Sequence, residues 1–123
     1  MIETERLILR PIQPEDLDRL LSIFADPKVM AAFGEAPFDR SQMAAWMQNH
    51  LDHEAGHGYG ALAVVLKANG DLIGDCALER MELDGVSCVE LGYDFRSDYW
   101  RQGLATEAAK AVLDYAPGML RLP

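Results

Sequence analysis

The chain has 123 residues, of which 50% are hydrophobic and 25% charged, and this composition is typical of one soluble globular domain. Asp and Glu outnumber Lys and Arg by 20 to 11, which argues against a nucleic-acid partner and slightly favours a basic or amine-bearing one. The charged N-terminus is not a signal peptide and no apolar run reaches bilayer length, so we expect a cytoplasmic domain over residues 1–123 with no membrane partner.

The first half of the chain predicts one strand and two helices. Residues 6–12 (RLILRPI) predict a strand that stops at Pro11. A helix follows from about Pro14, because apolar residues recur at the helical period: Leu17, Leu20, Leu21 and Phe24. A second helix begins near Asp39, where Asp39 and Gln42 have the spacing of a capping box. Its predicted buried stripe consists of Met43, Trp46, Met47 and Leu51.

The second half predicts three strands and a last helix. The strands cover residues 59–67, 72–79 and 86–95, and they are joined by hairpin turns at Asn69-Gly70 and Asp84-Gly85. The helix covers about residues 106–115 and closes before Pro117-Gly118. Cys76 and Cys88 lie outside any C-x-x-C pair, which favours small apolar strand residues over a disulfide or metal site. The order of elements predicts an α+β (mixed α/β) fold.

Residues 53–57 (HEAGH) fit the H-E-x-x-H pattern, in which two histidines bind zinc and the glutamate activates a water. A zinc-protease helix continues past its second histidine, whereas Gly56 and Gly58 predict that this helix ends at His57. The sequence that follows (GYGALAV) lacks the further histidine of the extended motif, and Glu79 lies on a predicted strand. We therefore interpret the match as accidental and expect no metal, with zinc hydrolysis kept as the third hypothesis.

Residues 93–109 (YDFRSDYWRQGLATEAA) join a predicted strand to the last helix. The first amides of a helix are unpaired and lie at the positive end of its dipole, so they can hold a phosphate. Gly103 lets the backbone approach a ligand closely, Arg101 adds a positive charge, and Thr106 can cap the helix or donate to a phosphate. By themselves these residues fit a phosphate-binding loop and a plain capped turn equally well.

The sequence resembles the GCN5-related N-acetyltransferases (GNAT), in the branch of ribosomal-protein N-terminal acetyltransferases. The resemblance covers residues 4–116 and rests on three segments: TERLILRP (4–11), LIGDCAL (72–78) and ELGYDFRSDYWRQGLATEA (90–108). Gly103 and Ala105 fit the family's pyrophosphate loop, while Trp100 stands where Gln or Arg is usual, a departure that is common in this branch. The resemblance implies a GNAT-like fold with a central, mostly antiparallel sheet flanked by helices.

The resemblance further implies an acetyl-CoA-dependent N-acetyltransferase that moves an acetyl group directly to a primary amine, on a protein N-terminus or a small molecule. The pantetheine arm of acetyl-CoA would pair with the strand at Tyr93, Asp94 and Phe95. A backbone N–H on this strand would polarise the thioester carbonyl. The pyrophosphate would lie on the amides of the loop and of the helix start: Arg101, Gln102, Gly103, Leu104, Ala105 and Thr106.

A base must remove a proton from the amine before it can attack. Glu90, on the same strand, is the first candidate for this catalytic role. Glu79 is held in reserve, and Asp94 is a further candidate.

The fold of this family continues with another strand, which would begin at residues 121–123. The resemblance therefore implies a domain that is truncated at its C-terminus, with weaker cofactor binding and no residue for the general acid. It also predicts an exposed sheet edge at residues 86–95, which favours pairing with another strand and hence a homo-oligomer. The alternative function is a non-catalytic truncated GNAT module that binds acetyl-CoA or pairs with a partner strand.

Overall fold

A five-stranded antiparallel sheet in the order β1-β2-β3-β4-β5 forms the centre of the protein. The computed structural model describes the backbone of residues 1–120 and the side chains of residues 1–115, except those of residues 81 and 83. The strands are β1 (Ile2–Glu3), β2 (Leu7–Pro11), β3 (Ala61–Leu66), β4 (Leu72–Leu83) and β5 (Val86–Phe95). The helices are α1 (Leu17–Phe24), α2 (Pro27–Ala31), α3 (Arg40–His57) and α4 (Leu104–Leu120), with short 3-10 turns η1 (Pro14–Asp16) and η2 (Ser97–Tyr99).

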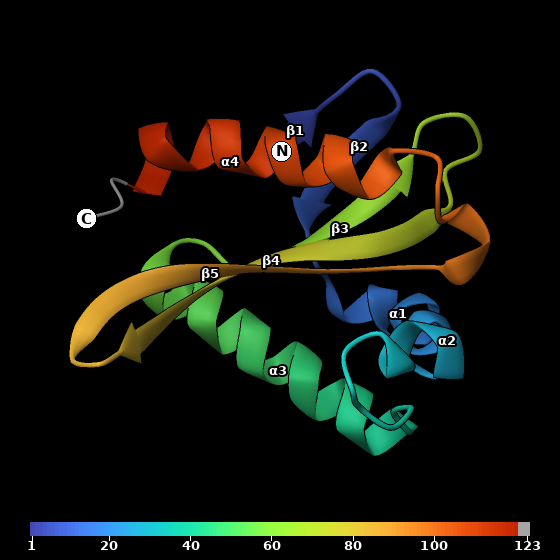
Figure 1. Ribbon diagram of the computed structural model, residues 1–123, viewed down its shortest axis with the longest axis horizontal. Helices are drawn as coiled ribbons and strands as arrows, with labels where there is room; N and C mark the ends of the chain where they lie inside the picture. The colour runs from blue at the N-terminus through green and yellow to red at the C-terminus, as the bar shows by residue number, and fades with distance from the viewer. Residues whose placement is uncertain (121–123) are drawn as a thin grey trace.

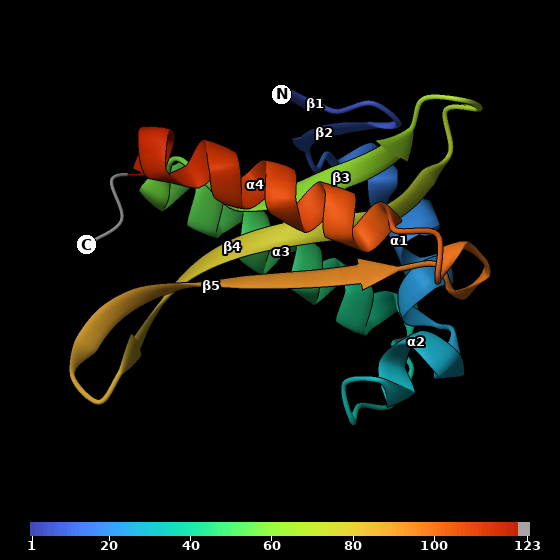
Figure 2. The same ribbon diagram turned by 45° about the horizontal axis from the view of Figure 1, so that its top comes forward.

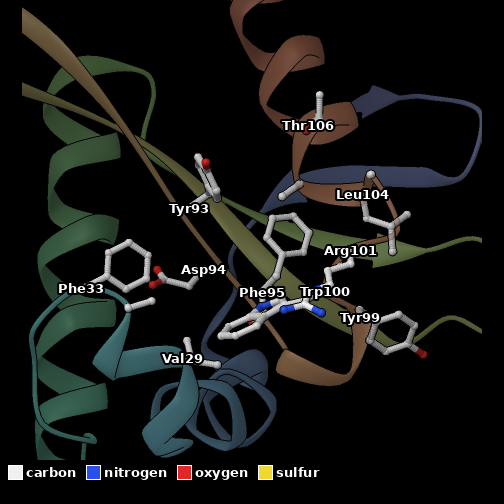
Figure 3. Close-up of a pocket in the computed structure, with 13 residues that line it drawn as sticks. Val29, Phe33, Tyr93, Asp94, Phe95, Tyr99, Trp100, Arg101, Leu104 and Thr106 are labelled. Atoms are coloured by element: carbon white, nitrogen blue, oxygen red, sulfur yellow. The ribbon is translucent and has the colours of Figure 1, made fainter.

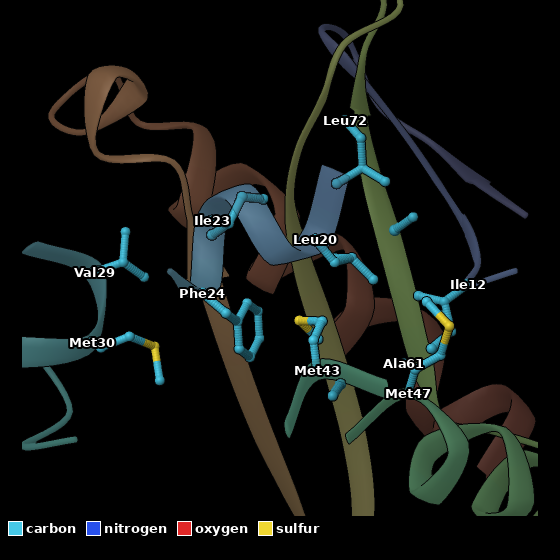
Figure 4. Packing of buried hydrophobic residues seen from close by; sticks show 12 residues of the cluster. Ile12, Leu20, Ile23, Phe24, Val29, Met30, Met43, Met47, Ala61 and Leu72 are labelled. Atoms are coloured by element: carbon cyan, nitrogen blue, oxygen red, sulfur yellow. The ribbon is translucent and has the colours of Figure 1, made fainter. Parts of the chain in front are cut away.

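The helices cover the two faces of this sheet, and the predicted α+β architecture is thereby confirmed (Figures 1 and 2). Helix α4 lies over one face, where Leu104 and Val112 pack with Ile73 and Phe95 of the sheet. Helices α1, α2 and α3 lie on the opposite face, and Figure 4 shows their buried apolar side chains. This second cluster includes Leu20, Phe24, Val29, Met30, Met43 and Met47.

Local sequence signals predicted several boundaries correctly. The capping box of α3 is present, since Asp39 Oδ1 accepts from the Gln42 amide and Gln42 Oε1 accepts from the Asp39 amide, each at 2.8 Å. The helix ends at His57, and Gly58 caps it with a φ of 80°. Asp84 and Gly85, with φ of 52° and 79°, form the tight turn that pairs β4 with β5.

Other boundaries differ from the prediction. Strand β1 and helix α2 were not predicted, because two and five residues are too short for a periodic signal. Strand β4 continues four residues beyond Glu79, since its pairing with β5 extends from Gly74 to Leu83. Within residues 1–120, no helix combines the length and the apolar character that a membrane crossing requires.

The last helix starts earlier and ends later than predicted. It begins at Leu104 rather than Thr106, because Leu104 extends the buried stripe of Ala108 and Val112 by one turn. It also continues across Pro117 and Gly118 to Leu120. Proline removes one helical hydrogen bond but keeps a helical φ, so it does not by itself end the helix. The predicted start of a further strand at residues 121–123 lies outside the described residues.

Candidate functional site

A cavity of about 470 Å³ lies between the end of β5, the start of α4 and helix α2 (Figure 3); we call it the loop cavity. Val29, Ala32 and Phe33 line it from α2 and the residues after it. The other lining residues are Tyr93, Asp94, Phe95, Tyr99, Trp100, Arg101, Gly103, Leu104, Ala105 and Thr106. The cavity thus brings together every residue that the sequence assigned to cofactor binding except Gln102.

The loop between β5 and α4 turns twice through left-handed backbone. Arg101 and Gly103 have φ of 65° and 78°, a region that costs a side-chain-bearing residue such as Arg101 about 1 kcal/mol or more. The first backbone bond of α4 runs from the Glu107 amide to the Gly103 carbonyl at 3.0 Å. The amides of residues 104–106 therefore precede the helical bonding pattern and lie at the positive end of the helix dipole. Such a turn can hold an anion against the cavity.

The N-terminal segment holds this loop in place. Arg6 Nε donates to Glu107 Oε1 at 2.7 Å, and Arg6 Nη1 donates to the carbonyl oxygen of Gln102 at 3.0 Å. Thr4 Oγ1 and the Arg6 amide donate to Glu107 Oε2 at 2.5 and 3.0 Å. Partial burial alone would raise the pKa of Glu107, but these hydrogen bonds outweigh it and lower that pKa. Sequence reasoning missed these contacts, although Thr4 and Arg6 lie in the segment that carried the family resemblance.

Within residues 1–120, strand β5 lies at the edge of the sheet and offers backbone groups to the loop cavity. The Arg96 amide donates to the Ile73 carbonyl at 2.8 Å, in register with the β4–β5 pairs. Because bonded and non-bonded pairs alternate in an antiparallel ladder, the backbone groups of Tyr93 and Phe95 point away from β4, towards the open edge. One of them, the Phe95 carbonyl, accepts from Trp100 Nε1 at 2.9 Å.

A second cavity, of about 340 Å³, lies on the other face of β4 and β5, against α1 and α3; we call it the acidic cavity. Two pairs of acidic side chains lie on its floor. In each pair, a residue of β4 lies opposite a residue of β5: Asp75 opposite Asp94, and Glu79 opposite Glu90. Between them lies the small pair Ala77 and Gly92. The remaining lining residues are Phe24, Met30, Phe33, Glu35, Phe38, Trp46, His50 and Tyr93.

The inner pair of carboxylates is buried. Asp75 is only 1% exposed, and its Oδ1 has no hydrogen-bond partner among the described residues. Burial first, and then the facing Asp94 carboxylate, hold the pKa of Asp75 well above its usual range. Burial likewise raises the pKa of Asp94, whereas its hydrogen bond with Asp75 opposes that rise. Asp75 therefore holds its proton more tightly than an ordinary aspartic acid, and its protonated carboxyl can donate to Asp94.

The two cavities meet at β5. Phe33, Tyr93 and Asp94 line both of them. In Figure 3, Asp94 projects from the strand towards Phe33. Of the three carboxylates that the sequence suggested as bases, Asp94 lines both cavities, whereas Glu79 and Glu90 line only the acidic cavity. A group bound in one cavity can therefore reach the other beside Asp94.

His53, the first histidine of the HEAGH segment, has backbone partners on both ring nitrogens. His53 Nδ1 lies 3.0 Å from the Tyr59 carbonyl oxygen, and His53 Nε2 accepts from the Arg80 amide at 2.9 Å. Because a carbonyl can only accept, His53 is neutral with its proton on Nδ1, and both ring nitrogens are occupied. Among residues 1–120, no three His, Cys, Asp or Glu side chains are grouped as a metal site requires. His53 therefore links β4 to the segment that follows α3.

Comparisons with known proteins agree with this architecture. Residues 6–123 match the family model described as the acetyltransferase (GNAT) domain. An uncharacterized N-acetyltransferase p20 of Bacillus licheniformis is 31% identical over 97% of this chain and 67% of that protein. The uncharacterized protein YkkB of Bacillus subtilis (strain 168) is 31% identical over 91% of this chain and 65% of that protein.

Among solved structures, an acetyltransferase from Agrobacterium tumefaciens str. C58 has a TM-score of 0.83 and 30% identity. That match covers 99% of this chain and 69% of the solved one. The chain thus spans about two thirds of the length of the proteins it matches. The loop geometry, the sheet order and the family match lead to one conclusion: this chain belongs to the GNAT acetyltransferase family.

Proposed function

We propose that the protein transfers an acetyl group from acetyl-CoA directly to a primary amine, with acetyl-CoA held in the loop cavity and the amine entering from the acidic cavity. The observation that carries this proposal is the left-handed turn at Arg101 and Gly103, which leaves the first amides of α4 unpaired beside a cavity of about 470 Å³. A pyrophosphate suits such a turn, because the unpaired amides and Arg101 border the same cavity and can both donate to an anion there.

The chain's own groups would align the thioester. The backbone of Tyr93 and Phe95 faces the open edge of β5, so a pantetheine arm can pair there as an added strand. An N–H group at this edge can donate to the thioester carbonyl oxygen as negative charge develops on it. The exposed rings of Phe33, Tyr93 and Trp100 border the same cavity and can shield the thioester from water.

In the transfer, the amine nitrogen bonds to the carbonyl carbon and the carbon–sulfur bond breaks. The nitrogen gives up one proton and the thiolate takes up one, so the products are an N-substituted acetamide and CoA thiol. The amine must be neutral when it attacks, because an ammonium has no free electron pair. A base near the junction of the two cavities is therefore required.

We assign this base to Asp94 rather than to Glu90, which the sequence favoured. Asp94 lines both cavities, whereas Glu90 lies four residues back along β5 and lines only one. Burial raises the pKa of Asp94, which makes it a stronger proton acceptor than an ordinary surface carboxylate. Asp75 supports this role as a positioning residue, since its protonated carboxyl can donate to the Asp94 carboxylate and orient it.

The primary test is calorimetric titration of acetyl-CoA into the protein and into Arg101→Glu, with EDTA present. We expect saturable binding that the charge reversal weakens by about tenfold or more, the effect of removing one charge-assisted hydrogen bond and adding a like charge. Arg101→Gly separates charge from backbone, because glycine adopts the same positive φ without strain. Arg19→Glu, an exposed change on α1, is the matched control and should bind as the unaltered protein does.

Thiol release from acetyl-CoA with a panel of primary amines then tests transfer. Release that depends on the amine supports the N-acetyltransferase, and its loss in Asp94→Asn supports the assigned base. Binding of acetyl-CoA without release from any amine would instead support the non-catalytic GNAT module. No binding to the protein, or equal weakening in Arg19→Glu, would overturn the loop cavity as the cofactor site.

The acceptor of the resembled branch is a ribosomal-protein N-terminus. For this chain the branch assignment rests on residues 4–11, 72–78 and 90–108, and an N-terminal peptide is accordingly one member of the amine panel.

A further inference from the structure

The floor of the acidic cavity places carboxyl groups opposite each other. Asp75 faces Asp94, and Glu79 faces Glu90, on one face of two adjacent strands. The proton retained by Asp75 relieves the first pair. Like charges directly across an antiparallel pair destabilise a sheet, so the second pair, Glu79 and Glu90, needs a compensating partner. Among the described residues, no lysine or arginine lines this cavity. Glu35 adds a further carboxylate at its wall.

Two buried polar atoms in the same cavity lack a partner within the described part of the chain. They are Oδ1 of Asp75, whose side chain is 1% exposed, and Nδ1 of His50, which is 8% exposed. Burial lowers the pKa of His50, so the ring is neutral at neutral pH and Nδ1 can accept a hydrogen bond in one tautomer. Both atoms can therefore accept from the N–H groups of an amine. Each of these two atoms, if it stays unpaired, lowers the folding stability by about 1–3 kcal/mol.

Aromatic rings complete the wall of the cavity. The Phe24 ring lies 5.2 Å from that of Phe38 and 5.0 Å from that of Trp46, and the Trp46 ring lies 4.2 Å from that of His50. Tryptophan, tyrosine and phenylalanine attract cations through the faces of their rings, and their apolar edges suit alkyl chains. The cavity thus combines several carboxylates with an aromatic wall, a combination that favours organic cations over inorganic ones.

The spacing of the two acidic pairs sets the shape of this cation. Four residues separate Asp94 from Glu90 along β5, and at roughly 3.3 Å per residue the two pairs lie about 13 Å apart. Ala77 and Gly92 leave room for a chain between them.

We propose that the acidic cavity binds the acceptor, and that this acceptor is a linear aliphatic amine carrying at least two positive charges. The reacting amino group lies beside Asp94, where the two cavities meet, and the second ammonium group lies between Glu79 and Glu90. This inference deepens the proposed acetyl transfer and rests on it for the reaction, but the binding of a dication can be measured without turnover.

The test compares 1,8-diaminooctane with octylamine, which has the same alkyl chain and one ammonium group fewer. Calorimetry in the absence of acetyl-CoA measures their binding, and thiol release in its presence measures transfer. We expect the diamine to bind about tenfold more tightly than the monoamine, as one additional charge-assisted contact allows. Glu79→Gln and Glu90→Gln should each remove most of this preference. Glu82→Gln is the matched control, since Glu82 is exposed on β4 and does not line the cavity.

Each outcome decides one of the two proposals. Equal affinity for the two amines would overturn the dication site. An equal loss of the diamine preference in Glu82→Gln would also overturn it, since the preference would then depend only on the overall charge of the protein. Thiol release with both amines and no diamine preference would retain the acetyltransferase and overturn the dication site. Diamine binding that depends on Glu79 and Glu90, without thiol release from any amine, would retain the dication site and overturn the transfer.

Discussion

The guanidinium of Arg6 donates to Glu107 Oε1 at 2.7 Å and so joins the start of the chain to the first turn of α4, 101 residues away. The same guanidinium reaches the carbonyl of Gln102 at 3.0 Å, in the turn before that helix. Glu107 lies near the helix N-terminus, where a carboxylate is favourable to the helix dipole. This ion pair therefore couples the stability of the fold to the shape of the turn at Arg101 and Gly103.

Replacing Arg6 by alanine should weaken both stability and cofactor binding. Loss of the contacts to Glu107 and Gln102 should cost about 1 kcal/mol, or roughly 3–5 °C in Tm for a domain of this size. The acetyl-CoA dissociation constant should rise about fivefold, because the turn is no longer held in its binding conformation. Thermal unfolding and calorimetry measure the two effects.

Arg40→Ala is the control for Arg6→Ala. Arg40 forms an ion pair with Asp18 at 2.6 Å, but both side chains are well exposed. Such pairs contribute about 0.5 kcal/mol or less. Neither Arg40 nor Asp18 lines the loop cavity. An equal loss of acetyl-CoA affinity in both variants would contradict the role given to Arg6.

Gly74 is required where β4 passes the end of β5. A Cβ at this position would lie 2.5 Å from the Asp94 carbonyl oxygen and 2.8 Å from Phe95 Cδ2, so one of the two strands must move. Gly74→Ala should destabilise the protein by about 1–3 kcal/mol, the usual cost of overpacking, and should reduce acetyl-CoA binding. Gly56→Ala, in α3 with no atom within 4 Å of the added Cβ, should keep full binding. Unchanged stability and binding in Gly74→Ala would contradict this prediction, since the strands would then accommodate the added Cβ without loss of stability.

Much of the fold could be predicted because its signals are local. The Asp39 and Gln42 capping box, the Gly58 helix end and the Asp84-Gly85 turn each depend on residues within a few positions of one another. The start of α4 was misassigned because Thr106 resembles a capping residue, whereas tertiary burial of Leu104 decides where the helix begins.

The acidic cavity could have been found from the sequence, whereas the anchoring of the loop could not. A two-residue turn at Asp84-Gly85 fixes the strand register, and counting back from it pairs Glu79 with Glu90 and Asp75 with Asp94. By contrast, nothing in the sequence links Arg6 to Glu107, because their contact arises only when β2 and α4 pack together.

The open edge of β5 should promote self-association. Val86 is 65% exposed at its start, and the backbone groups of Tyr93 face outwards near its end. Unpaired edges of this kind recruit other strands. Sedimentation velocity should detect species larger than a monomer, and saturating acetyl-CoA should shift them towards the monomer, since it would compete for the same edge. A protein that stays monomeric at every protein concentration, with or without acetyl-CoA, would contradict this prediction.

The Asp75–Asp94 pair should make stability fall as pH rises. Asp75 has a folded pKa well above its ordinary value of 3.8, so the folded state keeps a proton that the unfolded state releases. Its contribution is therefore fully present below about pH 3.8 and is lost progressively as pH rises towards the folded pKa. Asp75→Asn removes this loss, because an amide cannot ionise and its NH₂ group still donates to Asp94.

Thermal unfolding of Asp75→Asn and of the unaltered protein should thus diverge with pH. We expect similar Tm values near pH 4 and a Tm several degrees higher for Asp75→Asn at pH 8, where a shift of 1 kcal/mol corresponds to about 3–5 °C. Asp18→Asn, at an exposed position on α1, should show no such divergence. An Asp75→Asn effect that is the same at both pH values would mean that packing, rather than the retained proton, distinguishes the two side chains. A lower Tm for Asp75→Asn at pH 8 would show instead that the buried carboxyl is charged and paired in the folded protein.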